Sequence, residues 1–179
     1  LTTLNLGYAN KAPVDYKYPY QQLECLEATI SQGATQHTIQ FPSVKKRPNK
    51  VMVLFMAQAC HAGSYQHNPA HFLHAGVSDI SLKFHGVEMG RLQSNFTTGD
   101  ATQAYDSLVR AVPHKSLEAS SNGISYEDFK TKYPIFGWDT TLGYGATQDT
   151  QENADITIDI SLAISANLLS GCIIILSLS

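Results

Sequence analysis

Isoleucine and leucine alternate with polar or small residues over residues 155–164, which read DITIDISLAI. The apolar members of this run are Ile156, Ile158, Ile160, Leu162 and Ile164. A period of two puts them on one face of a β-strand and puts Asp155 and Asp159 on the other face. The chain therefore contains a strand with one buried face, and a second layer has to cover that face.

Further strand patterns recur at short intervals along the chain. They lie at Leu23–Ile30, Thr35–Phe41, Val51–Ala59, Val77–Phe84, Val87–Met89, Ile135–Asp139 and Cys172–Leu178. The run VMVLFMAQA at Val51–Ala59 is almost continuously apolar, which is typical of a strand buried on both faces. We expect a polar loop at Pro42–Asn49, a loop at His61–His74, a loop at Gly143–Asn153, and turns at His85–Gly86 and Gly171.

Two short helical patterns fall between the strands. The first covers Gln103–Val112, with Asp100 or Thr102 as candidate caps, and Pro113 ends it. The second runs to Lys132, with Ser125 and Asp128 resembling a capping box. Strands and helices do not alternate as in βαβ units. The sequence therefore predicts an all-β fold: a single eight-stranded jelly-roll sandwich with two short helices in the connections.

The length of 179 residues fits one domain. Residues 1–22 contain Tyr16, Tyr18 and Tyr20 among prolines that oppose both helix and central strand. We predict an extended Tyr/Pro-rich arm at residues 1–22 and a jelly-roll domain at residues 23–179. The arm packs on its own domain or lies on a neighbouring subunit, and the sequence leaves both alternatives open.

Charged residues make up 15% of the chain, against about 25% in an average globular protein. A low charge suits a surface that neighbouring chains partly cover. The net charge of −3 gives no reason to expect direct nucleic-acid binding. The apolar C-terminal run is shorter than the ~20 residues of a membrane helix, so we predict no membrane span. The three cysteines are widely spaced and do not form a disulfide framework.

No residue set has the pattern of a catalytic site. Four histidines crowd one loop, but apart from Cys60 no Cys, Asp or Glu joins them before Asp79, so contact histidines are favoured over a metal site. The acidic side chains near the C-terminus are better explained by a solvated strand face than by a catalytic pair. Nucleophile-elbow, P-loop and dinucleotide motifs are absent from the sequence. We predict a protein that is not an enzyme and has no cofactor and no metal.

Several short blocks follow one another in a characteristic order. They are Asn68–Pro69 with Phe72, the turn Phe84–His85–Gly86, Tyr105 with Leu108, the run Asn122–Phe129, and Tyr133, Phe136 and Asp139–Thr140. This series resembles the C-terminal jelly roll of hexon-like, double jelly-roll major capsid proteins, the family of large DNA viruses and polinton- or adintovirus-type elements. The likeness covers about residues 60–165. A full member of the family has two jelly rolls, whereas this chain has room for one.

The resemblance implies a structural capsid protein of the virion that assembles into trimers or rings. Its partners would be other copies of itself or a second jelly-roll chain. We expect the loop from Asn95 to Gly123 to contact other subunits. The candidate contact residues are Tyr16, Tyr18, Tyr20, His67, His71, His74, Tyr105 and Trp138.

Two other functions remain open. A carbohydrate- or receptor-binding jelly roll would expose an aromatic row, for which Trp138, Tyr144 and Tyr133 are the candidates, although a core position for Trp138 is favoured. A cupin-type enzyme would need a His/Glu metal set on paired strands, whereas four histidines crowd one loop and His85 lies at the edge of a strand. Asn95–Phe96–Thr97 is a glycosylation sequon that matters for a secreted chain.

Overall fold

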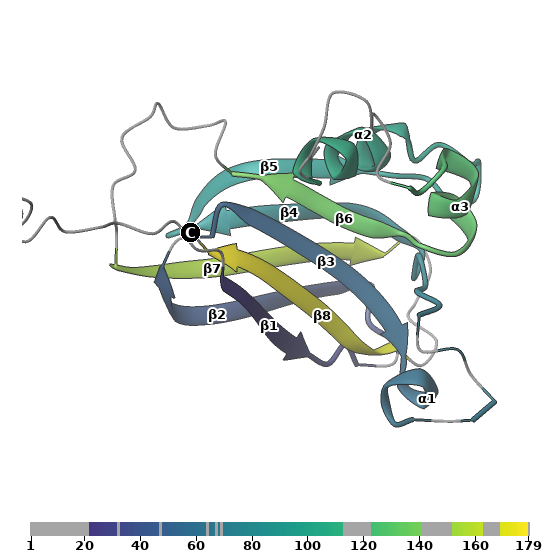
Figure 1. Cartoon of the computed structure of the whole chain (residues 1–179), viewed down its shortest axis with the longest axis horizontal. Helices are drawn as coiled ribbons and strands as arrows, with labels where there is room; N and C mark the ends of the chain where they lie inside the picture. Colours follow the sequence, from purple (N-terminus) through teal and green to yellow (C-terminus); the bar gives the residue numbers. More distant parts are fainter. Residues whose placement is uncertain are drawn as a thin grey trace, which may run out of the picture.

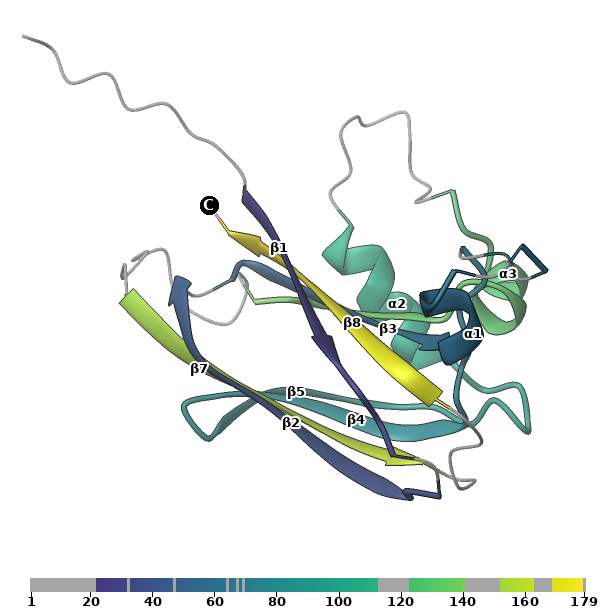
Figure 2. The same cartoon turned by 90° about the horizontal axis from the view of Figure 1, so that it is seen from below.

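Strands in the computed structural model form two four-stranded antiparallel sheets that face each other (Figure 2). The model describes residues 22–31, 33–46, 48–63, 65–66, 68, 70–112, 123–140, 152–162 and 169–178. The first sheet has the order β1 (Gln22–Ala28), β8 (Leu169–Leu178), β3 (Lys50–Ala57) and β6 (Ile135–Asp139). The second sheet has the order β2 (Gln36–Lys46), β7 (Glu152–Leu162), β4 (Val77–Phe84) and β5 (Val87–Gln93). The prediction of a mostly β chain with antiparallel sheets is confirmed.

Short helices lie in the connections between these strands, as predicted. They are α1 (Gln58–His61), α2 (Thr102–Ala111) and α3 (Tyr126–Thr131). The sequence predicted α2 and α3 but missed α1, because the apolar run extends to Ala59 whereas β3 ends at Ala57. In Figure 1, α2 and α3 lie beside β6, and α1 follows the far end of β3.

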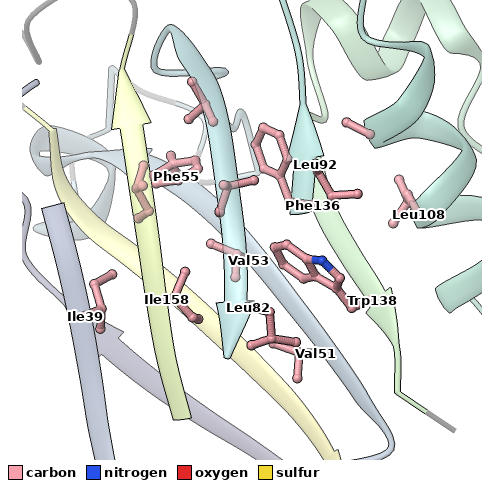
Figure 3. Packing of buried hydrophobic residues seen from close by; sticks show 14 of the residues in the cluster. Ile39, Val51, Val53, Phe55, Leu82, Leu92, Leu108, Phe136, Trp138 and Ile158 are labelled. Atoms are coloured by element: carbon pink, nitrogen blue, oxygen red, sulfur yellow. The ribbon is translucent and has the colours of Figure 1, made fainter. Parts of the chain in front are cut away.

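The core lies between the two sheets and is built from the inward-facing residue of each alternating pair. On β7 these residues are Ile156, Ile158 and Ile160, each at most 1% exposed. They belong to one core cluster with Val53 and Phe55 from β3, and Figure 3 shows Ile158 with these two side chains between the sheets. Burying one such side chain contributes about 1.5–3 kcal/mol, so the predicted alternation of β7 accounts for much of what holds this sheet to its partner.

Strand β3 is buried on both faces, as its nearly continuous apolar sequence predicted. Val51, Val53 and Phe55 belong to the core between the sheets. Leu54 and Met56, which alternate with them, are also buried. A strand with neighbours on both sides and cover on both faces leaves little room for a charged side chain, so the charged residue of β3, Lys50, stands at its first position and Val51–Ala57 contains none.

Some local strand predictions were wrong, and two of them fail at interruptions of strand register. The alternation of the sequence predicts Val77 on the same face of β4 as Asp79 and Lys83, but Val77 is 1% exposed, since the pairing with β7 shifts between Val77 and Asp79. Such an irregularity changes which residues face the core. Strand β2 continues through Pro42 to Lys46 instead of ending in a loop, with a register shift between Phe41 and Val44. This edge strand tolerates a residue without a backbone N–H.

Near the ends of the last two strands, the expected turn at Gly171 lies inside β8. The pairing of β3 with β8 is irregular between Phe55 and Ala57, close to that glycine. The loop expected up to Asn153 also ends earlier, because β7 begins at Glu152. Both differences show that a glycine or a polar pair near a strand end does not by itself stop the strand.

Helix α2 covers the edges of both sheets on one side of the sandwich. The Gln103 side chain accepts a hydrogen bond from Gln93 N (3.0 Å) and donates one to Arg91 O (3.2 Å), both on the edge strand β5. One turn later, Ser107 donates to Gly137 O on β6, the edge strand of the first sheet. Lys50 on β3 donates to Ala111 O at the last turn of α2 (2.7 Å). The helix is thereby fixed against both edge strands.

Close packing between α2 and β6 depends on a glycine. A Cβ atom at Gly137 would lie 3.0 Å from the Ala111 side chain and 3.3 Å from Leu108 Cα. The second of these neighbours is backbone and does not yield without moving the helix. Gly137 is therefore required by the approach of α2 and not by an unusual backbone angle.

We expect Gly137→Ala to lower the free energy of unfolding by about 1–3 kcal/mol, because the added methyl group pushes α2 away from β6. Urea denaturation followed by tryptophan fluorescence measures this, since Trp138 is the next residue. Gln40→Ala, at an exposed position of β2, is the control and should change stability by less than about 0.5 kcal/mol. Equal effects of the two substitutions would contradict the packing argument.

Candidate functional site

The predicted contact residues do not form one patch. Tyr16, Tyr18, Tyr20 and His67 lie outside the described residues. His71 and His74 are exposed in the loop before β4, Tyr105 is half-buried on α2, and Trp138 is 5% exposed on β6. Two of them, His74 and Tyr105, belong to a set of aromatic rings through which α2, α3 and two loops pack against β6.

We call this set the aromatic cluster; it consists of His74, Phe96, Tyr105, Tyr126, Phe129 and Phe136. The His74 ring stacks on Phe96 with centroids 4.9 Å apart. Phe96 in turn contacts Phe129 of α3 at 6.3 Å and Phe136 of β6 at 6.2 Å. Tyr105 of α2 packs on Phe129 at 5.5 Å. Rings at these separations attract each other beyond their area burial, so the cluster joins the loop before β4, the turn after β5, α2, α3 and β6 into one unit.

Tyrosine hydroxyls in the cluster bond to backbone groups of neighbouring segments. Tyr126 Oη donates to Gly99 O (2.9 Å) and accepts from Ala101 N (3.0 Å), just before α2 begins. Tyr105 Oη donates to Ile124 O (2.8 Å), just before α3 begins. Each helix thus holds the segment that precedes the other helix. The two tyrosine rings also meet edge to face, with centroids 5.4 Å apart.

The sequence predicted the N-cap residue of α3 but not that of α2. At α3 the predicted Ser125 cap is present: Ser125 Oγ accepts from Asp128 N (3.1 Å) and donates to the Asp128 carboxylate (2.8 Å). The bond from Ser125 and a second from Lys132 lower the pKa of Asp128. At α2 the N-cap is Ala101 and not Asp100 or Thr102, although the Asp100 carboxylate accepts from Thr102 N (3.4 Å). The N–H of Ala101 is accepted by the Tyr126 hydroxyl, from another helix.

The turn that carries Phe96 is closed by its own polar groups. Asn95 and Asp100 form an antiparallel bridge, and Asn95 Oδ1 accepts from Thr98 N (3.1 Å). Asn95 and Thr97, the two polar residues of the sequon, are exposed, whereas Phe96 between them packs on the core. The sequence identified the sequon but did not predict that Phe96 packs on the core. A single Phe in a polar stretch does not repeat with the spacing of a helix or a strand, so no pattern indicates its burial.

Trp138 lies inside the sandwich and not on a binding surface. Its ring points into the core among Val53, Leu82 and Phe136 (Figure 3). A Cβ atom at Gly90 on β5 would lie 2.9 Å from Trp138 Cδ1, so the glycine makes room for the indole. Trp138 Nε1 is buried and has no hydrogen-bond partner among the described residues. A side chain so enclosed offers almost no surface to a second subunit or to a stacked sugar.

The outer face of the second sheet is polar, as the alternation of β7 predicted. Asp159 on β7 accepts from Thr38 Oγ1 on β2 (2.7 Å) and from Lys83 Nζ on β4 (2.6 Å). These two donors, Lys83 first, hold the pKa of Asp159 below its ordinary value. Arg91 on β5 bonds Asp79 on β4 (2.6 Å) in the same way. An ionised carboxylate that accepts from a cation and a hydroxyl is poorly suited to donate a proton as a general acid.

Within the described ranges, no three His, Cys, Asp or Glu side chains are grouped so that they could hold a metal ion. The helices of the same ranges are too short or too polar to cross a membrane. No family model, curated protein or solved structure matches the chain. A functional assignment has to be argued from the chain's own geometry and from the ordered blocks of its sequence.

We expect Tyr126→Phe to destabilise the fold by roughly 1–3 kcal/mol, because it removes the hydroxyl that bonds both Gly99 O and Ala101 N and leaves the ring in place. Thermal or urea denaturation measures the change. Tyr65→Phe is the matched control, since Tyr65 is fully exposed. If Tyr126→Phe were as stable as the wild type, the hydroxyl would not hold α2 and α3 together.

His74 gives the fold a predicted pH dependence. Although His74 is exposed overall, its ring is partly buried where it stacks on Phe96, and this desolvation lowers the pKa of His74 below 6.5. Nδ1 accepts from Gly76 N (3.1 Å), which requires a neutral ring with no proton on Nδ1. The unfolded chain then binds the proton more readily than the folded chain. The His74 contribution to stability is therefore present above about pH 6.5 and is lost progressively as the pH falls below that value.

The measurement compares urea denaturation at about pH 7.5 and about pH 5. His74→Asn keeps an acceptor near Gly76 but does not titrate, so it should lose less stability between these two pH values than the wild type. His71→Asn, which changes an exposed histidine three residues away, is the control and should follow the wild type. A His74→Asn variant with the wild-type pH dependence would contradict the prediction.

Proposed function

We propose that this chain is a non-enzymatic structural protein of capsid type, a jelly roll that assembles with further copies of itself or with a second jelly-roll chain. The observation that carries the proposal is the strand order. When the eight strands of a jelly roll are lettered B to I, B-I-D-G faces C-H-E-F. With β1 as strand B, the order β1-β8-β3-β6 facing β2-β7-β4-β5 corresponds to that arrangement strand by strand.

The position of the ordered sequence blocks supports the same proposal. The block around Phe72 meets the block that ends α3, because Phe72 N donates to Lys132 O (3.2 Å). The Tyr105 block and the Tyr126 block meet through the hydroxyl bonds of the aromatic cluster. These blocks, which are separate in sequence, therefore form one region beside β6, whereas the Phe84–His85–Gly86 turn lies elsewhere, with His85 N donating to Asp155 O on β7 (3.0 Å). Residues that resemble a capsid family in order also act as one structural unit here.

The low charge of the chain is a further supporting observation. Charged residues are 15% of the sequence, and several on the described surface are paired within the chain, such as Lys83 with Asp159 and Arg91 with Asp79. Sides with few free charges lose less solvation free energy when another subunit covers them. On this proposal the protein resides in the virion, as a trimer or a ring.

The alternative of a carbohydrate- or receptor-binding module has less support. It needs exposed aromatic side chains, yet Trp138 is buried, Tyr133 is half-buried, and Tyr144 lies outside the described residues. A cupin-type metal site needs ligands that converge on paired strands, whereas His85 is exposed on the β4–β5 turn and His71 and His74 lie in a loop. Neither alternative has a specific observation in its favour.

Native mass spectrometry and negative-stain microscopy of the purified chain test the proposal. We expect oligomers whose population rises with protein concentration in the micromolar range, and rings or shells on the grid. Added glycans and added divalent metal should leave this distribution unchanged. A chain that stays monomeric throughout the concentration series would contradict the proposed function, as would a stoichiometric metal ion in elemental analysis.

A further inference from the structure

Each four-stranded sheet has two edge strands, and within the described residues the chain treats these four edges differently. On β5, Gln103 occupies a backbone N–H and a carbonyl. On β6, Ser107 occupies the carbonyl of Gly137. Strand β2 carries Pro42 and a register shift beside it. These are recognised ways of preventing an edge from pairing with another strand.

Strand β1 has neither a proline nor a register shift. It is seven residues long, Gln22–Ala28, and pairs with β8 in continuous register from end to end. No described strand pairs with its other edge. Leu23 is 72% exposed, one of the largest exposures of any large apolar side chain in the described residues, and Cys25 on the same face is exposed. In Figure 1, β1 lies at the end of its sheet remote from α2.

We propose that this open β1 edge binds the β1 edge of a second copy of the chain, antiparallel and about a two-fold axis. Two first sheets then join into one continuous sheet across the pair. An isologous contact of this kind needs a surface that is complementary to itself. The sequence of β1, QLECLEA, meets this requirement in one register.

Full pairing of all seven residues requires that the two-fold axis pass through Cys25, the central residue of β1. In that register Leu23 lies opposite Glu27 of the second copy and Glu24 lies opposite Leu26, so no acid directly faces an acid. Moving the axis to Glu24 shortens the pairing and sets two like charges opposite each other, which is destabilising. Moving it to Leu26 sets no like charges opposite each other but pairs five residues instead of seven. Like-charge repulsion and the length of the pairing together favour the Cys25-centred register over its two neighbours.

This register makes a prediction that depends on distance. Residues directly opposite in an antiparallel pair have Cα atoms about 4.5–5.5 Å apart. Disulfide bonds span Cα separations of roughly 4.4–6.8 Å. The two Cys25 thiols are therefore within bonding reach. Copper–phenanthroline in air supplies the oxidant: two thiols lose two electrons and two protons to it, and one S–S bond forms.

The experiment treats the full chain with this oxidant at micromolar concentration and identifies the linked peptides by mass spectrometry. We expect a Cys25–Cys25 linkage as the main intermolecular product. Leu23→Lys, which places a charge on the exposed edge, should reduce that product at least tenfold. Val87→Lys makes the same kind of change at another exposed apolar residue, beside the β4–β5 turn, and should leave the product unchanged.

A second variant tests the β1–β1 contact independently of the Cys25–Cys25 disulfide. Cys25→Ser should abolish the disulfide but keep the dimer seen by native mass spectrometry. Circular dichroism verifies that each variant is folded; if Leu23→Lys unfolds, the linkage map of the unmodified chain decides alone. A product that links Cys25 to another cysteine, or the absence of a cross-link from a chain that is oligomeric, would overturn the β1 contact.

The inference rests on the proposed self-assembly, and the outcomes of the two tests differ. Rings or shells without a Cys25 linkage would remove the β1 contact and leave the proposed function standing. A Cys25-linked dimer that never forms a larger assembly would leave the contact standing and contradict the capsid-type function. A chain that is monomeric and not cross-linked would contradict both.

Discussion

Two side chains one turn apart on α2 determine how this sandwich is closed. Gln103 bonds the edge of β5, and Ser107 bonds the edge of β6, so one helix serves an edge of each sheet. The helix can sit this close because residue 137 has no side chain. Tyr126 fixes its start and Lys50 its end. The aromatic cluster depends on this placement, because Tyr105 reaches Phe129 and Ile124 from α2.

The strands were predictable wherever a period of two was uninterrupted. Strands β4 and β6 have the predicted bounds, and on β7 the predicted face is the buried one. The Ser125 cap was also predictable, since donor and acceptor are three residues apart. These features are local: each depends on residues that are close in the sequence, where side-chain chemistry alone decides between helix, strand and turn.

The features that the sequence did not reveal depend on distant partners. The cap of α2 is a hydroxyl 25 residues away in the chain, and no spacing rule connects Tyr126 with Ala101. Val77 faces the core because its partner strand shifts register, which the sequence of β4 does not show. The residues of the aromatic cluster belong to separate helix, strand and loop patterns in the sequence. Their convergence into one cluster depends on the tertiary fold. The same limit applies to Trp138, whose burial depends on Gly90 of another strand.

Within the described residues, α2 covers one edge of each sheet, whereas no strand pairs with the outer edge of β1, so the two edges of the first sheet differ. Pairing of two β1 strands about a two-fold axis occupies both open edges of the two first sheets, so the joined sheet cannot add further strands there. On the proposed contact, self-association through this edge alone would end at a pair and would not continue into a fibre. A ring or shell built from this chain has to use other surfaces as well, and the low charge of the sandwich makes its sides suitable for that purpose. The β1 edge would set the orientation of neighbouring copies, and the remaining contacts would set the size of the assembly.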